Sequence, residues 1–332
     1  MLKHSNDSDP GITRKKIGRA WGYFDSAGNR ITDRNEIDRL NAVALPPAYT
    51  DAWFCPDPDG HIQATGKDAR GRKQYRYHAD YRAKQDASKY QGTREFGHAL
   101  PKLRRRVERD LKKRKLDRDA VIAAVVRLLD TEQMRIGNEQ YAKANKSFGA
   151  TTLRVHHVRS KGGKLKMRFT GKHGIVHEAT ITDASLKRIV KQCQDLPGQK
   201  LFQYVNGDGQ PQAIDSSDVN AYIREATGGD FTAKHFRTWG ASVIAFEQLL
   251  SKAENARVSL KTVIEPVAEA LGNTAAMSRK SYVHPALIDS LKDRPRDPLR
   301  GMKRPRARKW LTSAEVGLLK FLARKPRKKA TA

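Results

Sequence analysis

Residues 118–134 read "RDAVIAAVVRLLDTEQM", and this stretch decides the fold expected for the larger part of the chain. Its apolar residues recur at helical spacing, which predicts a buried helix. The helix leads directly into "RIGNEQY", residues 135–141, so a core element carries a polar loop that begins with Arg135. The apolar positions that define the buried stripe are Val121, Ile122, Val125, Leu128 and Leu129.

An antiparallel β-meander is expected next. In "KLKMRFT", residues 164–170, apolar and basic residues alternate, which predicts a strand with one buried and one basic face. The turn "TGKHG", residues 170–174, follows and places Lys172 at the tip of a hairpin. The second strand of the hairpin contains Ile175, Ala179 and Ile181.

The segment after the meander is expected to be helical, because capping residues precede successive apolar stretches. The last helix of this series is short and carries Tyr282, and His284-Pro285 ends it. The residues expected to cap these helices are Asp183, Asp215, Thr232, Ser259 and Thr274.

The N-terminal part has a different character, because residues 17–81 are dense in turn residues between short aromatic and β-branched stretches. We therefore expect an α+β chain with a small β-rich N-terminal domain and a larger, mainly α-helical catalytic domain that contains the meander. The expected boundaries are residues 1–90, 91–295 and a basic, solvated C-terminal tail, 296–332, with one short amphipathic piece around Val316 to Leu322.

The charge of the chain indicates its partner. Sixty-five Lys and Arg residues against 36 Asp and Glu residues give a formal net charge of +29. So large an excess favours a polyanion, since each neutralised phosphate releases condensed counterions. Nucleic acid is the favoured partner, and an anionic membrane is the alternative, for which the chain offers no basic amphipathic helix with a bulky aromatic face.

The remaining composition narrows the class of protein. No stretch approaches the roughly 20 apolar residues that a bilayer span requires, and the N-terminus lacks the apolar region of a secretory signal. Two cysteines, Cys55 and Cys193, provide neither a disulfide framework nor a metal site. A cytoplasmic location is expected, nucleoid-associated if the source is bacterial.

Two familiar routes to phosphate chemistry are disfavoured. "TGKHG" lacks the first glycine and the Ser or Thr of a P-loop. No compact group of carboxylates suggests a two-metal nuclease, and the histidines lack zinc-site spacing. We therefore expect no cofactor and no metal.

Metal-free transfer of a phosphodiester requires a different set of side chains. Guanidinium groups can neutralise the non-bridging oxygens, and a general acid must protonate the departing 5′-oxygen. A tyrosine phenol suits the nucleophile, because it is also a good leaving group when the strand is resealed.

Four motifs occur in the order that this chemistry requires. "RIGNEQY", "FTGKHG", "KHFRTWGAS" and "LGNTAAMSRKSY" together resemble the type IB DNA topoisomerases in their short poxvirus-like and bacterial form. "GKDARGRKQYRYH", residues 66–78, is similar to the DNA-clasping part of the same family's N-terminal domain. The resemblance covers residues 20–290 and implies a monomer that clamps duplex DNA, with no membrane and no obligate protein partner. The basic C-terminal tail is then most simply a solvated DNA tether.

The resemblance also implies roles for individual residues. Arg135 and Arg237 correspond to the arginines that clamp the scissile phosphate, and Lys172 to the general acid. Tyr282 corresponds to the nucleophile that forms a 3′-phosphotyrosyl intermediate. Asn273 stands where the poxvirus-like pattern has a histidine that contacts a non-bridging oxygen. Its amide can donate that hydrogen bond but carries no charge, and the alternative is that it simply ends a helix.

Further residues match DNA-contacting positions of the family. Those in the N-terminal segment include two tyrosines, for which inward packing in an ordinary strand is the alternative. Two more, Tyr141 and Lys234, lie in the larger domain, and Lys234 stands three residues before Arg237. The expected DNA-binding residues are Lys67, Arg70, Arg72, Lys73, Gln74, Tyr75, Tyr77, Tyr141 and Lys234.

The resemblance implies relaxation of supercoiled DNA without ATP, by transient cleavage of one strand and religation. A tyrosine site-specific recombinase is one alternative, since it shares the Arg-Lys-Arg-Tyr chemistry. Recombinases usually have His rather than Lys three residues before the second arginine, and they begin with a helical domain. The other alternative is a non-catalytic DNA-binding protein, which would not require all four catalytic residue types.

Overall fold

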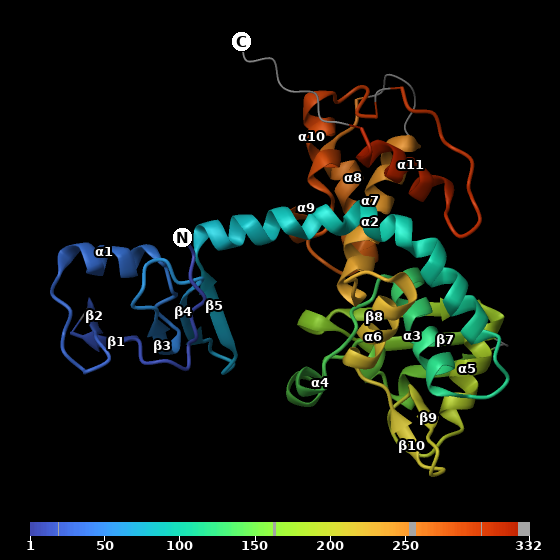
Figure 1. The fold of residues 1–332 in the computed structure, drawn as a ribbon, viewed down its shortest axis with the longest axis horizontal. Helices are drawn as coiled ribbons and strands as arrows, with labels where there is room; N and C mark the ends of the chain where they lie inside the picture. Colours follow the sequence, from blue (N-terminus) through green and yellow to red (C-terminus); the bar gives the residue numbers. More distant parts are fainter. Residues whose placement is uncertain (19, 162–163, 252–256, 300, 325–332) are drawn as a thin grey trace. The chain divides into compact units, whose positions relative to one another are not determined.

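The computed structural model describes residues 1–332 except for 19, 162–163, 252–256, 300 and 325–332 (Figure 1). The chain divides into two compact units, Met1–Lys89 and Tyr90–Ala332. Among the described residues, no helix is long and apolar enough to cross a membrane.

The first unit is built on a five-stranded antiparallel sheet in the order β2-β1-β3-β4-β5. Its small core contains Tyr23, Phe54 and Ala64 from the sheet and Leu40 from a helix. The elements are β1 (Ile12–Ile17), β2 (Ala20–Phe24), α1 (Arg34–Ala42), β3 (Thr50–Phe54), β4 (Ile62–Lys67) and β5 (Lys73–Tyr77).

Helix α1 differs from the expectation of strands and turns alone between residues 17 and 81. Asp33 caps the helix by accepting a hydrogen bond from the Asn35 amide, and Leu40 is buried. After the turn at residues 26–29, a single antiparallel bridge joins Phe24 and Arg30.

The second unit has α3 (Arg118–Glu132) at its centre, and the expected stripe of this helix is fully buried. Alanines on the other faces of α3 are buried as well, so neighbouring helices approach it closely from several sides. Helices α5 (Ala184–Gln194), α6 (Ser216–Thr227) and α7 (Ala233–Leu250) all contact it.

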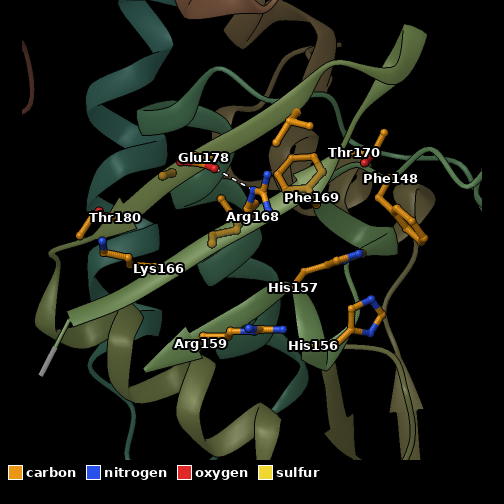
Figure 2. Close-up of a pocket in the computed structure, with 13 residues that line it drawn as sticks. Phe148, His156, His157, Arg159, Lys166, Arg168, Phe169, Thr170, Glu178 and Thr180 are labelled. Carbon is orange, nitrogen blue, oxygen red and sulfur yellow. Dashed lines mark ion pairs between the residues drawn. The ribbon is translucent and has the colours of Figure 1, made fainter. Parts of the chain in front are cut away.

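A three-stranded antiparallel sheet, order β6-β7-β8, forms the expected meander. Along β7 (Lys164–Thr170) every second residue is buried, so Lys166 and Arg168 lie on the exposed face (Figure 2). Arg168 pairs there with Glu178 at 2.8 Å. The flanking strands are β6 (Val158–Lys161) and β8 (Val176–Ile181).

The helices that follow begin at the expected caps, since Asp183, Asp215, Thr232, Ser259 and Thr274 are their N-cap residues. The expected α+β class, with an antiparallel N-terminal sheet and a mainly helical remainder, is therefore confirmed. The remaining elements are α2 (Ala79–Leu111), α4 (Glu139–Asn145), η1 (Ala150–Thr152), η2 (Val155–His157), η3 (Lys172–Gly174), β9 (Gln203–Val205), β10 (Pro211–Ala213), α8 (Leu260–Leu271), α9 (Ala275–Ser281), α10 (Pro285–Asp293) and α11 (Ser313–Leu322).

The C-terminal segment differs from the expected solvated tail, 296–332. Helix α11 packs on α7 (Figure 1), and Val316, Leu318 and Leu319 join the main hydrophobic core. The apolar surface of α11 is removed from water, so residues up to Leu322 belong to the folded unit.

Candidate active site

The loop that carries Arg135 is fixed by its own backbone. After α3 ends, Gln133 adopts a left-handed conformation with φ of 50°. The Ala150 amide donates to the Arg135 carbonyl at 2.8 Å. A Cβ on Gly149 would lie 2.6 Å from that same oxygen and 2.6 Å from the Gly137 nitrogen. Only glycine allows this approach, which holds the Arg135 loop against the segment that follows it.

Arg237 lies in the second turn of α7 and only 4% of its surface is exposed. Its guanidinium donates hydrogen bonds to the carbonyl oxygens of Gln133 and, at 2.9 Å, Leu271. Burial and the nearby charge of Arg135 lower the pKa of Arg237 to about 10. Since this value is well above 7, Arg237 stays positively charged at neutral pH.

Tyr282 directly follows α9, and its amide donates to the Ser278 carbonyl. The Arg237 Cζ atom lies 5.0 Å from the centre of the Tyr282 ring, within range of a cation–π contact. Burial raises the pKa of Tyr282. The charges and hydrogen bonds of Arg237 and Arg135 lower it by more, so the net pKa lies below the usual value for a tyrosine. The two arginines therefore favour the phenolate.

Asn273 connects this centre to the end of α8. Gly272 adopts the left-handed C-cap conformation, and the Asn273 amide donates to the Ala268 carbonyl. The Asn273 Oδ1 atom accepts a hydrogen bond from Arg135 at 3.0 Å. Its Nδ2 atom is buried and has no acceptor among the described residues. Asn273 thus ends a helix and also presents a free donor beside an arginine.

Lys172 is exposed in the turn between β7 and β8, as its hairpin position predicted. It lines a cavity of about 430 Å³ together with Arg135, Arg237 and Tyr282. Tyr141 and Lys234 line the same cavity. No Asp or Glu is among the described residues that line it, so the cavity suits an anion such as a phosphodiester.

A larger cavity of about 690 Å³ lies against the β6-β7-β8 sheet (Figure 2). It is lined by His156, His157, Lys166 and Arg168, among others, and by none of the residues proposed from the sequence for catalysis. Among the described residues, no three His, Cys, Asp or Glu side chains come together as a metal site. The smaller cavity is the one lined by Tyr282 together with Arg135, Arg237 and Lys172.

Comparison with known proteins identifies the family. Residues 78–300, two thirds of the chain, match the family described as "Eukaryotic DNA topoisomerase I, catalytic core". Residues 20–68 match "Bacterial DNA topoisomerase IB, N-terminal domain". The chain belongs to the type IB DNA topoisomerases. As a member of that family it binds DNA and relaxes supercoiled duplexes.

Individual relatives of this type IB topoisomerase agree with the assignment. It is 34% identical to DNA topoisomerase 1B of Acanthamoeba polyphaga mimivirus over 285 residues, which is 82% of this chain and 85% of the relative. DNA topoisomerase 1B of vaccinia virus (strain Copenhagen) is 20% identical over 276 residues, 80% of this chain and 85% of that one. A solved site-specific recombinase, XerH, aligns with a TM-score of 0.35 and 16% identity over 55% of this chain and 49% of its own.

The residues expected to contact DNA from the topoisomerase's first unit lie on β4, β5 and the turn between them. Tyr75 and Tyr77 are exposed by 43% and 46% and stack on each other with ring centres 6.0 Å apart. The alternative of inward packing therefore does not hold for them. That these rings and the neighbouring Gln74 contact DNA stays a prediction.

Three of the four basic residues expected to contact DNA here already have acidic partners. Lys67 pairs with Asp51 at 2.7 Å, and Lys73 pairs with Asp7 at 2.5 Å. Asp68 binds both Arg72, at 2.7 Å, and Gln74, at 2.9 Å. Arg70 is exposed and has no ion-pair partner among the described residues. Phosphate contacts by the paired side chains must compete with these intramolecular bonds.

Sequence reasoning missed several groups of the topoisomerase that surround Arg237 and Arg135. The carbonyls of Gln133 and Leu271 hold Arg237 but leave no mark on the side-chain pattern. His177 stacks on Phe169, with ring centres 5.2 Å apart. Burial lowers the pKa of His177, and the charges of Arg237 and Arg135 lower it further. In the sequence, only the glycine of "FGAT", residues 148–151, hints at this packing, because such a glycine can mark a place where two backbone segments approach closely. Here Gly149 lies against the backbone of Arg135 and Gly137.

Proposed function

We propose that Tyr282 is the nucleophile with which this topoisomerase cleaves one DNA strand. Arg135 and Arg237 would bind the non-bridging oxygens of the scissile phosphate, and Lys172 would protonate the departing 5′-oxygen. Asn273 would donate its free Nδ2 hydrogen bond to a non-bridging oxygen. The observation that carries this assignment is the single cavity lined by both arginines, Lys172 and Tyr282.

The proposed reaction balances without a nucleotide. The phenolate oxygen of Tyr282 attacks the phosphorus while the bond from phosphorus to the 5′-oxygen breaks. The phenol proton leaves to solvent, and Lys172 supplies a proton to the 5′-oxygen. The strand then carries a 3′-phosphotyrosyl bond and a free 5′-hydroxyl, which rotates about the intact strand. Resealing is the reverse reaction, and the torsion of the supercoiled DNA drives the net change.

A plasmid assay tests the proposal. Supercoiled DNA of either sign should relax with EDTA present and ATP absent, and denaturant should trap protein on the 3′ end of the broken strand. Tyr282→Phe should abolish both results while DNA binding persists. Tyr204→Phe is the matched control, since this tyrosine lies on β9 and bonds Gln212 instead. A fully active Tyr282→Phe variant would show that the assignment is wrong.

We also propose that the protein acts as a monomer in the cytoplasm, associated with the nucleoid if the source is bacterial, without an obligate protein partner. The net charge of +29 supports sequence-independent DNA affinity without a second subunit. Sedimentation of the protein on a short duplex should give a one-to-one complex. A defined recombinant product in place of relaxed plasmid would instead favour a recombinase.

A further inference from the structure

Helix α11 lies beyond residues 78–300, the part of the chain that matches the catalytic-core family. It nevertheless contributes a buried acid to the second unit. Glu315 is 4% exposed, and Thr312 caps the helix in a capping box with it. A carboxylate is costly to bury unless its oxygens are paired, so its partners indicate its purpose.

The partners of Glu315 come from two other helices. The Arg104 guanidinium, on α2, donates to both carboxylate oxygens at 2.8 and 2.7 Å. The indole nitrogen of Trp239, on α7, donates to Oε1 at 3.0 Å. The hydrogen bonds and charge of Arg104 outweigh the effect of burial and lower the pKa of Glu315. Glu315 is therefore a buried anion that holds α11 to α2 and α7.

Arg104 extends these contacts to the end of α3. It donates to both oxygens of Asp130, at 2.7 and 2.8 Å, so one guanidinium bridges two carboxylates. Asp130 lies three residues before Gln133, and the Gln133 side chain donates to the Asp130 carbonyl at 2.7 Å. The Gln133 carbonyl in turn accepts a hydrogen bond from Arg237.

The network thus reaches Arg237 from two directions. Trp239 lies two residues after Arg237 on α7, and Asp130 lies in the last turn of α3, before the Arg135 loop. We propose that Glu315 is a positioning residue, which acts through Arg104 and Trp239 to keep α3 and α7 aligned so that Arg237 and Arg135 can grip the same phosphate. This inference rests on the proposed roles of those arginines.

The ion network of Glu315, Arg104 and Asp130 can fix the relative positions of helices more closely than an apolar contact would. Replacing a buried ion network by apolar residues is often neutral or stabilising, so stability alone does not explain it. Its bidentate bonds fix the direction of approach as well as the distance. A small shift at a distance from the reacting atoms can still lower a rate strongly.

Glu315→Gln tests the inference, because it keeps the side-chain shape while removing the charge. Glu247→Gln is the matched control, since Glu247 is half exposed on α7 and pairs with Arg304 of the same C-terminal segment at 3.6 Å. Single-turnover cleavage would be measured on a suicide duplex, at a temperature where both variants are folded. Affinity for the same duplex would be measured in the Tyr282→Phe background.

We expect Glu315→Gln to cleave about 10- to 100-fold more slowly while its DNA affinity changes less than twofold. The defect should shrink on a duplex with a methylphosphonate at the cleavage site, because that phosphate has lost the charge that the arginines neutralise. Asp130→Asn should give the same pattern and serves as the second variant if Glu315→Gln does not fold. Glu247→Gln should cleave normally.

Several results would overturn the inference. Normal cleavage by a folded Glu315→Gln variant would do so, as would a defect confined to DNA affinity. A defect equally large on the methylphosphonate duplex would show that Glu315 does not act through the arginines. An unmodified protein that forms no covalent adduct would instead overturn the proposed function, and this inference with it.

Discussion

Asn273 places a neutral, buried hydrogen-bond donor beside Arg135, one of the two arginines that line the cavity. Its Oδ1 atom is occupied by Arg135, and this bond turns the buried Nδ2 donor away from the arginine. A protonated histidine here would add a third cation to a cavity where Arg135 already lowers the pKa of Arg237. The amide therefore provides direction without further charge repulsion.

Lys172 can be tested through the leaving group. Lys172→Ala should slow cleavage of ordinary DNA by about 10²–10⁴-fold, the usual contribution of a general acid. A duplex whose 5′-bridging oxygen is replaced by sulfur should be cleaved nearly as fast by the variant as by the unmodified protein, because a thiolate leaves without protonation. Single-turnover cleavage of the two duplexes gives this comparison. A variant that stays slow on the sulfur duplex would remove Lys172 from the acid role.

His157 should make the stability of the second unit depend on pH. Burial, then the charges of His156 and Arg154, lower the pKa of His157 to about 4. Its Nδ1 atom also accepts a hydrogen bond from the Arg154 amide, which requires that atom to be unprotonated. The unfolded chain takes up this proton near pH 6.5 and the folded chain only near pH 4. Stability from this group is thus lost as pH falls between these values.

His157→Asn should flatten that part of the pH profile, because Oδ1 of asparagine can accept the same hydrogen bond without titrating. Urea unfolding between pH 4 and pH 7 measures the slope for each protein. His98→Asn is the control, since that ring is exposed on α2 of the same unit. An unchanged slope in His157→Asn would contradict the prediction.

At the scale of elements, α2 and α7 approach each other closely at Gly97. A Cβ at this position would lie 2.3 Å from the Trp239 ring and 2.9 Å from Leu319 on α11. Gly97→Ala should therefore lower the free energy of unfolding by about 1–3 kcal/mol through overpacking. At Gly92, on the same helix, a Cβ would lie 4.0 Å from its nearest neighbouring atoms. Gly92→Ala should raise the free energy of unfolding by up to about 1 kcal/mol through helix propensity.

Chemical denaturation of the two alanine variants provides the comparison, and each serves as the control for the other. Equal effects of the two substitutions would show that the contact with Trp239 is not tight in solution.

The elements that sequence predicted share a local signal. The buried stripe of α3, the alternation along β7 and the capping residues are all readable within a few residues. Helix α1 has a capping residue, Asp33, but only one of its nine residues, Leu40, is buried, so its polar sequence shows no clear apolar stripe. Helix α11 is apolar but lies among basic residues, and its partners Arg104 and Trp239 are far away in the sequence. Local periodicity cannot report a partner of that kind.

The candidate site likewise contains residues that the sequence predicted and groups that only the structure revealed. Arg135, Lys172, Arg237 and Tyr282 were identified from motif order, and all four line one cavity. The groups that hold them in place are backbone carbonyls and the closely packed Gly149, which side-chain patterns record weakly. Sequence thus predicted which four side chains share a cavity, whereas the contacts that position them required the structure.

At the scale of the whole molecule, the charge of +29 predicts strong salt dependence of DNA binding. Arg70→Gln should reduce the slope of log affinity against log salt by about 0.9, since one phosphate contact is lost. Lys67→Gln should reduce it less, because Lys67 already pairs with Asp51 at 2.7 Å. Fluorescence anisotropy at several salt concentrations, in the Tyr282→Phe background, measures both slopes. Equal slopes for Arg70→Gln and the parent would show that Arg70 does not contact phosphate.

The two carbonyls that bind Arg237 belong to helix ends, one just after α3 and one at the last residue of α8. A helix C-terminus carries the equivalent of about half a negative charge. Two negative helix ends therefore lie beside the guanidinium and offset part of its repulsion by Arg135. A carboxylate in place of these two carbonyls would carry a full negative charge and repel the incoming phosphate. The carbonyls carry only partial charges, and their hydrogen bonds to Arg237 already occupy them. The macrodipoles let two like charges share one cavity and leave its attraction for DNA intact.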